Sequence, residues 1–373
     1  MKIHKHADDQ ASLPEGYAEP ALLKERLRRI AVFRALQLGD MLCSIPALRA
    51  LRCAFPDSEI TLIGLPWSRD FVGRFQAYFN RFLEFPGFPS FPERKPEVER
   101  FPGFIMECQK RRFDLVLQMH GDGSIINTLL PLLNARHCAG FFKNGNFIPD
   151  PARFMPWPTK GHEILRLLKL MIFLGLPLKG QDLEFPLAPS DHRALRQMLA
   201  KEHIRLQSFV CIHPGAQLQS KRWPAERFAA VADRIYEWGY DIVLTGKEEE
   251  QGLTRKIASL MHHSPCDLAG KTSLGALAAL LKKSRLVICN DTGISHMAVA
   301  LQKPSLVVVT GSDPDRWAPL DRYQHKAVYH PADCRPCGYD ICPFGQPCAE
   351  QISTQEILQY AENFLLHKRK GLF

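Results

Sequence analysis

The chain has 373 residues, a length that predicts two domains because a single typical core does not extend over so many residues. Its composition, 46% hydrophobic and 23% charged, is typical of a folded globular protein, and no apolar run approaches the roughly 20 residues of a membrane-spanning helix. The formal net charge of +9 favours anionic partners, but the basic residues do not form the aromatic-interleaved face typical of nucleic-acid binders, so we expect no nucleic acid partner.

The N-terminal sequence and the cysteines favour a cytoplasmic protein. The first residues contain no apolar stretch of the signal-peptide kind, and several cysteines are scattered singly within apolar runs, as buried reduced thiols are. Short basic groups occur at residues 24–29, 110–112 and 368–370. A solvated surface explains each group taken separately, and peripheral contact with the inner membrane surface is the functional alternative.

The first strands and helices predict a parallel sheet. Apolar runs at residues 29–34 and 59–64 predict strands, and the spacing of apolar residues over 44–55 predicts a helix between them. Residues 38–40 are predicted to form a turn. A strand, a helix and a strand in this order are typical of the βαβ unit of a parallel sheet.

Two Pro-rich passages interrupt the pattern. Residues 82–102 predict an irregular surface excursion, because closely spaced prolines exclude regular helix. A strand at 113–119 follows, with a turn and a helix running to Leu133. The second passage, at 149–158, precedes a predicted helix at 162–174.

Residues 175–189 mix Pro, Leu and Gly without periodicity and form the predicted domain boundary. The pattern then repeats, with predicted strands at 209–213, 241–245, 286–289 and 305–310 and helices at 224–238, 274–282 and from 294. We therefore expect two doubly wound α/β domains, at residues 1–182 and 183–350. Their ligands should bind beyond the carboxyl ends of the strands.

Three predicted strands are followed by loops with candidate functional residues. Asp40 follows the first strand and is the candidate general base. Ser220 and Lys221 put a hydroxyl and a cation beside the start of a helix, where Lys221 would bind phosphate as a point charge. Glu248 could accept from ribose hydroxyls, although residues 248–250 are explained equally well as an acidic cluster at a helix start.

The fourth loop, NDTGISH from Asn290, is the most informative. Asp291, Thr292 and Gly293 can turn the chain and open a helix, whose free N–H groups and positive dipole end attract an anion. Thr292 adds a hydroxyl donor, Gly293 permits close approach to the backbone, and Asp291 can accept from sugar hydroxyls. The loop suggests a site for a phosphorylated sugar, and an ordinary capped turn is the structural alternative.

Four ordered segments resemble those of the ADP-heptose:lipopolysaccharide heptosyltransferases, glycosyltransferase family 9. They are RALQLGDMLCSIPALRAL at 34–51, HPGAQLQSKRWPAERFAAVADRI at 213–235, LAGKTSLGALAALLKKSRLVICNDTGISHMAVAL at 268–301 and CRPCGYDICPFGQPC at 334–348. The resemblance implies the GT-B fold, in which two Rossmann-like domains face a central cleft. The first, at 1–182, would bind the acceptor and carry the catalytic Asp, and the second, at 183–350, would bind the nucleotide-sugar. The resemblance also implies that the final helix, within residues 351–373, returns to the first domain.

The resemblance implies an inverting, metal-independent transfer of heptose from ADP-heptose to the lipopolysaccharide core or a related anionic glycolipid, without a cofactor. The nucleotide-diphosphate sugar is then the donor and the glycolipid the acceptor. The family's residues correspond to catalytic Asp40, phosphate-binding Lys221, ribose-contacting Glu248, and a donor turn with Asp291, Thr292, Gly293 and His296.

Two other functions stay open. A nucleotide-sugar epimerase of GT-B fold would need additional acid–base carboxylates around the same site. A non-catalytic nucleotide-sugar or anionic-glycan-binding protein would keep Lys221 and the turn at 291–293, but replacement of Asp40 would cost it no function.

Three further features of the sequence give weaker evidence of function. His120 and Asn127 follow a strand of the first domain and are candidate acceptor contacts, with turn and capping roles as the alternative. Trp223 is expected to pack beside its loop and not to stack on adenine. The tail cysteines, spaced C-x2-C-x4-C-x5-C, suggest zinc, but this spacing is tighter than that of a zinc ribbon's two separated pairs, so no metal site is predicted.

Overall fold

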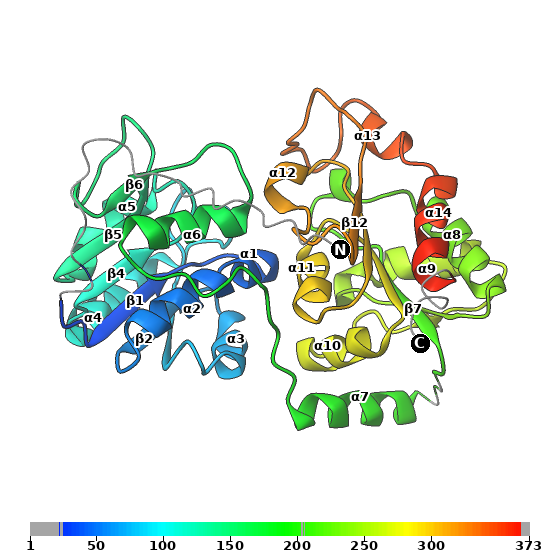
Figure 1. Ribbon diagram of the computed structural model, residues 1–373, viewed down its shortest axis with the longest axis horizontal. Coiled ribbons are helices and arrows are strands. Elements are labelled where there is room, and N and C mark those ends of the chain that lie inside the picture. Colours follow the sequence, from blue (N-terminus) through cyan, green and yellow to red (C-terminus); the bar gives the residue numbers. More distant parts are fainter. Residues whose placement is uncertain (1–21, 23–24, 203, 205, 367–373) are drawn as a thin grey trace, which may run out of the picture. The chain divides into compact units, whose positions relative to one another are not determined.

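The computed structural model describes residues 22, 25–202, 204 and 206–366. The chain divides into two compact units: Met1–Gln37 with Ser44–Gln181, and Leu38–Cys43 with Asp182–Phe373. The main passage between the units therefore lies within the Pro- and Leu-containing residues 175–189. Each unit contains one sheet covered by helices (Figure 1).

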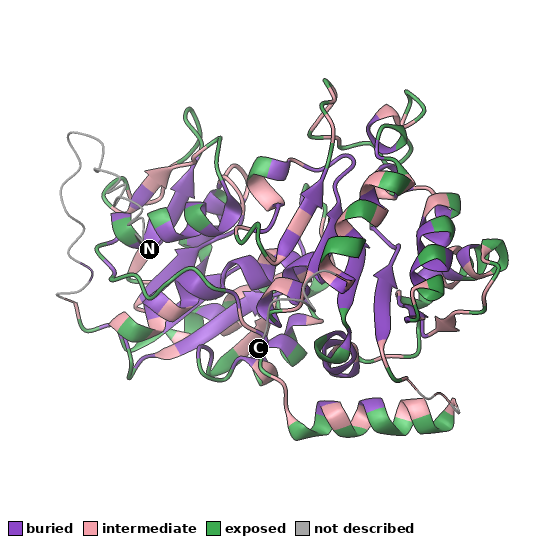
Figure 2. Cartoon of the chain, turned by 45° about the vertical axis from the view of Figure 1, so that its right-hand side comes forward, coloured by how far each residue is buried: buried purple, intermediate pink, exposed green. Residues whose placement is uncertain are grey.

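The first unit contains a six-stranded parallel sheet in the order β3-β2-β1-β4-β5-β6. Its strands are β1 (Arg29–Phe33), β2 (Glu59–Gly64), β3 (Arg81–Glu84), β4 (Leu115–Gln118), β5 (His137–Phe142) and β6 (Phe154–Pro156). The apolar runs predicted as β1, β2 and β4 are buried on both faces, as parallel strands require (Figure 2). The order reverses between β1 and β4, so the loops after these two strands meet at the switch point where such sheets bind ligands.

The helices of the first unit begin and end at recognisable signals. They are α2 (Ile45–Ala54), α3 (Ser68–Arg74), η2 (Val98–Arg100), α4 (Phe101–Arg111), α5 (Ile126–Leu129), η3 (Leu130–Leu133) and α6 (Glu163–Phe173). Pro46 lies in the first turn of α2, where its missing N–H costs nothing. The side chain of His162 caps α6 by accepting from the backbone N–H of Ile164.

The Pro- and Phe-rich passage at residues 82–102 differs from the predicted surface excursion. It contains most of strand β3, and its Phe85 and Phe91 are buried in the core. The ring of Phe85 lies 5.0 Å from that of Phe33 and 5.6 Å from that of Phe104. A regular α-helix begins only at Phe101, with Pro102 in the first turn of α4. Before it, aromatic side chains bury a large apolar area from irregular backbone.

The second unit contains a second six-stranded parallel sheet, in the order β12-β11-β10-β7-β8-β9. Its strands are β7 (Phe209–His213), β8 (Asp241–Leu244), β9 (Cys266–Asp267), β10 (Leu286–Asn290), β11 (Ser305–Val308) and β12 (His325–Val328). Strands β7 and β10 are the neighbours at which the order reverses. The loops after them carry the 213–221 and 290–296 segments singled out from the sequence.

The helices of the second unit include one short helix from early in the chain. They are α1 (Leu38–Cys43), α7 (Pro189–Lys201), η4 (Gln219–Lys221), α8 (Ala225–Glu237), η5 (Glu248–Glu250), α9 (Gln251–Leu260), α10 (Leu274–Lys283), α11 (Gly293–Ala300), α12 (Pro314–Trp317), α13 (Pro347–Glu350) and α14 (Thr354–Leu365). Residues 38–40, predicted as a turn, are thus the first turn of α1, which packs on α11.

The final helix α14 packs on α8 of the second unit (Figure 1). Its Ile357, Ala361 and Leu365 join the core that contains Phe228, and the hydroxyl of Tyr240 donates to the carbonyl of Leu365. The sequence had suggested a return to the first domain, but the apolar stripe of α14 is buried here. Residues 367–373, including the basic group at 368–370, lie outside the described residues. In the described part of the chain, no helix combines the length and apolarity needed to cross a membrane.

Candidate active site

The turn between β10 and α11 has the geometry of an anion site. Thr292 has an extended backbone and stands at the N-cap of α11, whose first residue is Gly293. The hydroxyl of Ser295 donates to the Thr292 carbonyl at 2.7 Å, so this carbonyl of the turn has a partner. The hydroxyl of Thr292 is buried and has no hydrogen-bond partner among the described residues. A buried hydroxyl at a helix N-terminus is available to a ligand oxygen.

Asp291 has an unusual protonation equilibrium. Burial raises its pKa to about 6, a hydrogen bond from Ser312 and the cation of Lys221 act in the opposite direction, and the charge of Asp40 adds to the rise. Lys221 and Asp40, which were predicted separately from the sequence, are therefore each close enough to influence Asp291. Asp291, Lys221 and Asp40 all belong to the second compact unit, which includes residues 38–43.

Asn290 joins the loops around this turn. Its side chain is fully buried, donates to the carbonyl of Pro214 at 2.7 Å and accepts from the backbone N–H of Trp223 at 3.1 Å. Trp223 is itself buried, and its indole N–H donates to the Ile352 carbonyl at 3.1 Å. The prediction that Trp223 is a packing residue is confirmed.

The loop after β7 lies against Glu250. A β-carbon on Gly215 would overlap the carboxylate of Glu250, which also accepts from the Lys247 backbone N–H at 2.8 Å. The Nδ1 atom of His213 is hydrogen-bonded to the Thr245 hydroxyl at 3.1 Å. Burial lowers the pKa of His213 to about 4, so this histidine is neutral near pH 7.

The row of three glutamates points in different directions. Glu248, the candidate ribose contact, is exposed in η5, whereas Glu250 is buried against the 213–216 loop. Sequence reasoning missed Glu250 because three identical residues in a row do not reveal which one faces inward. The acidic-cluster alternative also describes part of this geometry, since Glu250 caps the backbone of Lys247.

Lys221 ends the short helix η4 and is half-buried. Its neighbour Ser220, predicted as a donor contact, is 2% exposed. The hydroxyl of Ser220 donates to the carbonyl of Tyr339 at 2.5 Å and so holds its loop, and its role as a donor contact stays a prediction. The side chain of Lys221 is the chemically available group of this pair.

Helix α1 carries Asp40 to the start of α11. Gly39 and Gly293 permit the close approach, because a β-carbon on Gly39 would lie 3.2 Å from the Gly293 α-carbon and 2.9 Å from the ring of His296. His296 is buried, with its Nδ1 3.5 Å from the sulfur of Cys43 and its ring 6.0 Å from that of Trp317. His296 therefore lies in the packing between α1 and α11, and its role as a donor contact stays a prediction.

The two candidate acceptor residues of the first unit are buried, His120 just after β4 and Asn127 in α5. The Nδ1 atom of His120 accepts from the Ala35 N–H at 3.3 Å, and burial, aided by the charge of Arg34, lowers the pKa of His120 to about 3. Asn127 is 1% exposed and donates to the Phe141 carbonyl at 3.0 Å. Each side chain therefore has one atom bonded to the backbone, and the role of both residues as acceptor contacts stays a prediction.

A buried charge cluster at the same edge was not predicted. Arg34 follows β1 and pairs with Glu163 at 3.2 Å, and Arg166 pairs with the same carboxylate at 2.6 Å while its guanidinium covers the Trp157 ring. All three ionic side chains are at most 3% exposed. The spacing of Glu163 and Arg166 on one helix face was the available signal, but Arg34 lies far away in sequence.

The described residues include no group of three or more His, Cys, Asp or Glu side chains arranged to hold a metal ion.

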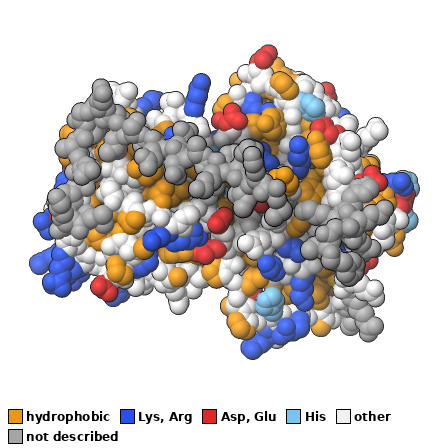
Figure 3. All heavy atoms as spheres, viewed as in Figure 1, with side chains coloured by type: hydrophobic (Ala, Val, Ile, Leu, Met, Phe, Trp, Pro, Cys, Tyr) orange, Lys and Arg blue, Asp and Glu red, His pale blue; other side chains and the backbone are white. Residues whose placement is uncertain are grey.

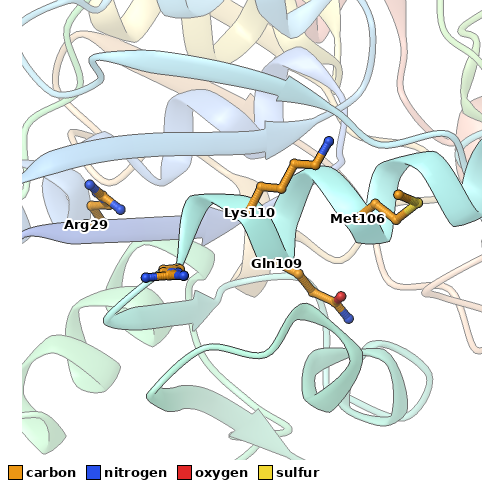
Figure 4. Close-up of a pocket in the computed structure, with 5 residues that line it drawn as sticks. Arg29, Met106, Gln109 and Lys110 are labelled. Carbon is orange, nitrogen blue, oxygen red and sulfur yellow. The ribbon is translucent and has the colours of Figure 1, made fainter.

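A cavity of about 570 Å³ lies at the amino-terminal edge of the first sheet, where β1 begins and α4 ends (Figure 4). Its lining is Arg29, Met106, Gln109, Lys110 and Arg112. Because it opens beside the amino end of β1, it is not part of the ligand-binding edge. On the face shown in Figure 3, Lys and Arg side chains form several separate groups.

Comparisons with known proteins agree on one family. Residues 104–346 match the model of glycosyltransferase family 9 (heptosyltransferase). The lipooligosaccharide heptosyltransferase 2 of Haemophilus ducreyi is 32% identical over 316 residues, which cover 79% of this chain and 86% of that protein.

Solved structures show the same fold. A family 9 glycosyl transferase from Veillonella parvula has a TM-score of 0.74 at 22% identity, covering 91% of this chain and 97% of the other. The E. coli ADP-heptose lps heptosyltransferase II has a TM-score of 0.71 at 17% identity, covering 92% and 100%. The fold is therefore the two-domain α/β architecture of these proteins, GT-B, as the sequence predicted.

Proposed function

This chain belongs to glycosyltransferase family 9, and from that membership and the geometry around Asp291 we propose that it transfers heptose from ADP-heptose to the lipopolysaccharide core or a related surface glycolipid. The observation that carries the donor assignment is the buried hydroxyl of Thr292 at the start of α11, which has no hydrogen-bond partner in the described part of the chain, with Lys221 near the same turn. The names of the similar proteins, a lipooligosaccharide heptosyltransferase and an ADP-heptose heptosyltransferase, support the same substrates.

The donor is held through its diphosphate and its sugars. The N–H groups at the start of α11 and the ammonium of Lys221 bind the phosphate oxygens, and the Thr292 hydroxyl donates to one of them. Ionised Asp291 accepts from a hydroxyl of the transferred sugar, and exposed Glu248 accepts from the ribose hydroxyls. His296, packed between α1 and α11, is a further proposed donor contact.

Asp40 is the proposed general base. It takes the proton of the acceptor hydroxyl as that oxygen attacks the anomeric carbon, while the bond from this carbon to the diphosphate oxygen breaks and ADP leaves with both electrons. The attack comes from the face opposite the leaving group, so the configuration inverts. Lys221 and α11 stabilise the negative charge that develops on the departing diphosphate.

We propose that this transfer needs no metal ion. A Lys side chain and a helix N-terminus supply the positive electrostatic environment that Mg²⁺ gives to diphosphate leaving groups in many other enzymes. Transfer rates measured in excess EDTA should then equal those in added Mg²⁺. A rate that falls with EDTA and returns with Mg²⁺ would contradict this part of the proposal.

The proposed acceptor is anchored in a membrane, so we propose a cytoplasmic enzyme that contacts the inner membrane surface peripherally. The net charge of +9 supports attraction to anionic head groups. Vesicles of phosphatidylglycerol should sediment the protein at low salt, and vesicles of phosphatidylcholine should not. Equal sedimentation with both, or with neither, would argue against electrostatic membrane contact.

The central test is a donor and acceptor screen. Thermal shift with ADP-, UDP- and GDP-sugars at equal concentration should give the largest stabilisation for the ADP-sugar, because stabilisation of the folded state increases with the logarithm of ligand concentration divided by Kd. Mass spectrometry should then detect heptose on a core acceptor that lacks it. Release of ADP without a glycosylated acceptor, or preference for a UDP-sugar, would overturn the assignment.

A further inference from the structure

The loop that carries Lys221 is covered by a segment from much later in the chain. We call residues 335–346, between β12 and α13 in Figure 1, the cysteine-bearing segment. Helix η4, with only three residues, has little hydrogen bonding of its own, so its conformation depends on what surrounds it. The surrounding groups come largely from this segment.

Asp340 makes the central contact. Its carboxylate oxygen Oδ1 accepts from the Gln219 N–H at 3.1 Å, and its carbonyl accepts from the Ser220 N–H at 2.8 Å. The two N–H groups at the start of η4, which a short helix leaves without intrahelical partners, are thus both satisfied by one residue. Asp340 thus caps η4 from a position 121 residues after Gln219 in the sequence.

Three more bonds close the loop from other sides. The hydroxyl of Ser220 donates to the Tyr339 carbonyl at 2.5 Å, and the side-chain amide of Gln346 donates to the Gln219 carbonyl at 3.0 Å. The hydroxyl of Thr310, at the end of β11, donates to the Ser220 carbonyl at 3.1 Å. Every polar backbone group of Gln219 and Ser220 therefore has a partner outside η4.

The segment is itself fixed to the sheet. The guanidinium of Arg335 donates to the Thr310 carbonyl at 2.7 Å, and the Cys337 N–H donates to the Gly311 carbonyl at 2.7 Å. A β-carbon on Gly311 would lie 3.0 Å from that of Cys337 and 3.7 Å from the Lys221 side chain. The residues that follow β11 therefore contact both the cysteine-bearing segment and the side chain of Lys221.

We propose that the cysteine-bearing segment positions Lys221 for the donor diphosphate, and that Asp340 is the positioning residue. This inference rests on the proposed function, because it takes Lys221 as the phosphate ligand. A flexible Lys side chain binds phosphate well only when its backbone is held, since otherwise the ordering cost is paid on binding. Asp340 touches no substrate and acts through the η4 backbone.

The test is a calorimetric double-mutant cycle with ADP as the probe. Asp340→Ala should weaken ADP binding about 3- to 10-fold, the scale of one or two lost hydrogen bonds, and raise the donor KM with little change in kcat. Asp340→Asn keeps the accepting oxygen and should stay within about twofold of wild type. Ile341→Ala, at the exposed neighbour, is the matched control and should also stay within about twofold.

The cycle is completed in a Lys221→Ala background. If Asp340 acts through Lys221, Asp340→Ala should cost no further ADP affinity there, whereas an equal loss in both backgrounds would overturn the inference. Should Asp340→Ala fail to fold, Gln346→Ala removes one bond to the same loop and should shift ADP affinity in the same direction. Full ADP affinity in both Asp340→Ala and Gln346→Ala would likewise overturn it.

The two proposals fail differently. If wild-type protein does not bind ADP, or Lys221→Ala binds it unchanged, the proposed donor site fails and the inference falls with it. If Lys221→Ala weakens ADP binding and Asp340→Ala does not, the donor site stands and only the positioning role is overturned.

Discussion

The carboxylate of Glu250 occupies the space where a side chain on Gly215 would begin. Gly215→Ala should therefore displace Glu250 or the 213–216 loop, with a loss of about 1 to 3 kcal/mol in the free energy of unfolding, the usual cost of overpacking. Because the loop continues to Lys221, ADP affinity should fall as well. Thermal unfolding and calorimetry would measure both effects.

The matched control is Gly252→Ala in α9, where nothing lies within 4 Å of an added β-carbon. This substitution should be neutral or stabilising by up to about 1 kcal/mol. Equal behaviour of the two variants would show that the Glu250 carboxylate moves away from Gly215 at no cost.

Thr292→Val should separate stability from binding. The buried hydroxyl of Thr292 has no partner among the described residues, so its replacement by an isosteric methyl group should not lower the unfolding temperature. ADP affinity should nevertheless fall about fivefold, the value of one hydrogen bond to the ligand. Unfolding temperature and ADP affinity are read on the same samples.

Thr254→Val is the opposite case. Its buried hydroxyl donates to the Asp267 carboxylate at 2.8 Å, so the substitution should cost about 1 to 2 kcal/mol of stability and leave ADP affinity unchanged. An unfolding temperature lowered equally by both variants would mean that the Thr292 hydroxyl already has a partner in the free protein.

Asp291 should titrate near pH 6. Burial raises its pKa to about 6 from the ordinary value of 3.8, Ser312 and Lys221 oppose the rise, and Asp40 adds to it. The folded protein therefore binds the Asp291 proton more tightly than the unfolded chain, and this residue costs stability as pH rises from about 4 to about 6. The unfolding temperature of Asp291→Asn, relative to wild type, should increase across this range.

Carbon-13 NMR of the Asp carboxyl groups would report the same equilibrium directly. One resonance should titrate near pH 6 and be absent from the spectrum of Asp291→Asn. In Asp40→Asn its midpoint should move to lower pH, because a like charge has been removed. A midpoint that stays unchanged in Asp40→Asn would show that the two carboxylates do not interact.

Asp40→Asn should abolish transfer without abolishing donor binding. Loss of a general base costs about 10²- to 10⁴-fold in kcat, whereas the groups that bind the diphosphate are unchanged. Calorimetry should give an ADP affinity within about threefold of wild type. Turnover that survives the substitution would remove Asp40 from the mechanism and favour a non-catalytic binding protein.

Lys221→Ala should weaken ADP binding by about 1.5 to 3 kcal/mol, the scale of a charge-assisted hydrogen bond. The control is Lys256→Ala, which removes an exposed lysine that pairs with Glu226 on the α8 and α9 surface. That variant should bind ADP as wild type does. If both variants lose affinity equally, the effect is one of net charge and not of a phosphate contact.

Local sequence patterns predicted much of the fold. Apolar runs marked β1, β2, β7 and β10, because a strand buried on both faces must be apolar along its length. The turn at Asp291–Gly293 was also visible, since its conformation and its capping depend on neighbouring residues. Asp40, Lys221 and the turn could thus be selected before any contact was known.

Long-range packing was not visible in the sequence. The passage at 82–102 was expected at the surface, but its Phe85 fills the core beside Phe33. Helix α14 has an apolar stripe that fits any complementary surface, and only the tertiary structure shows that α8 provides it. Proline and helix periodicity limit local backbone conformation, but they do not choose the partner of an apolar face.

At the candidate site the division is similar. The sequence alone determined which residue types could bind a diphosphate and in which loops they lie, because those properties are chemical and local. The tertiary structure decided that Glu250 faces inward and Glu248 outward, that the Ser220 hydroxyl is used by Tyr339, and that Asp340 caps the Lys221 loop. Those outcomes depend on which distant groups satisfy buried polar atoms, and the complete packing of the chain settles that.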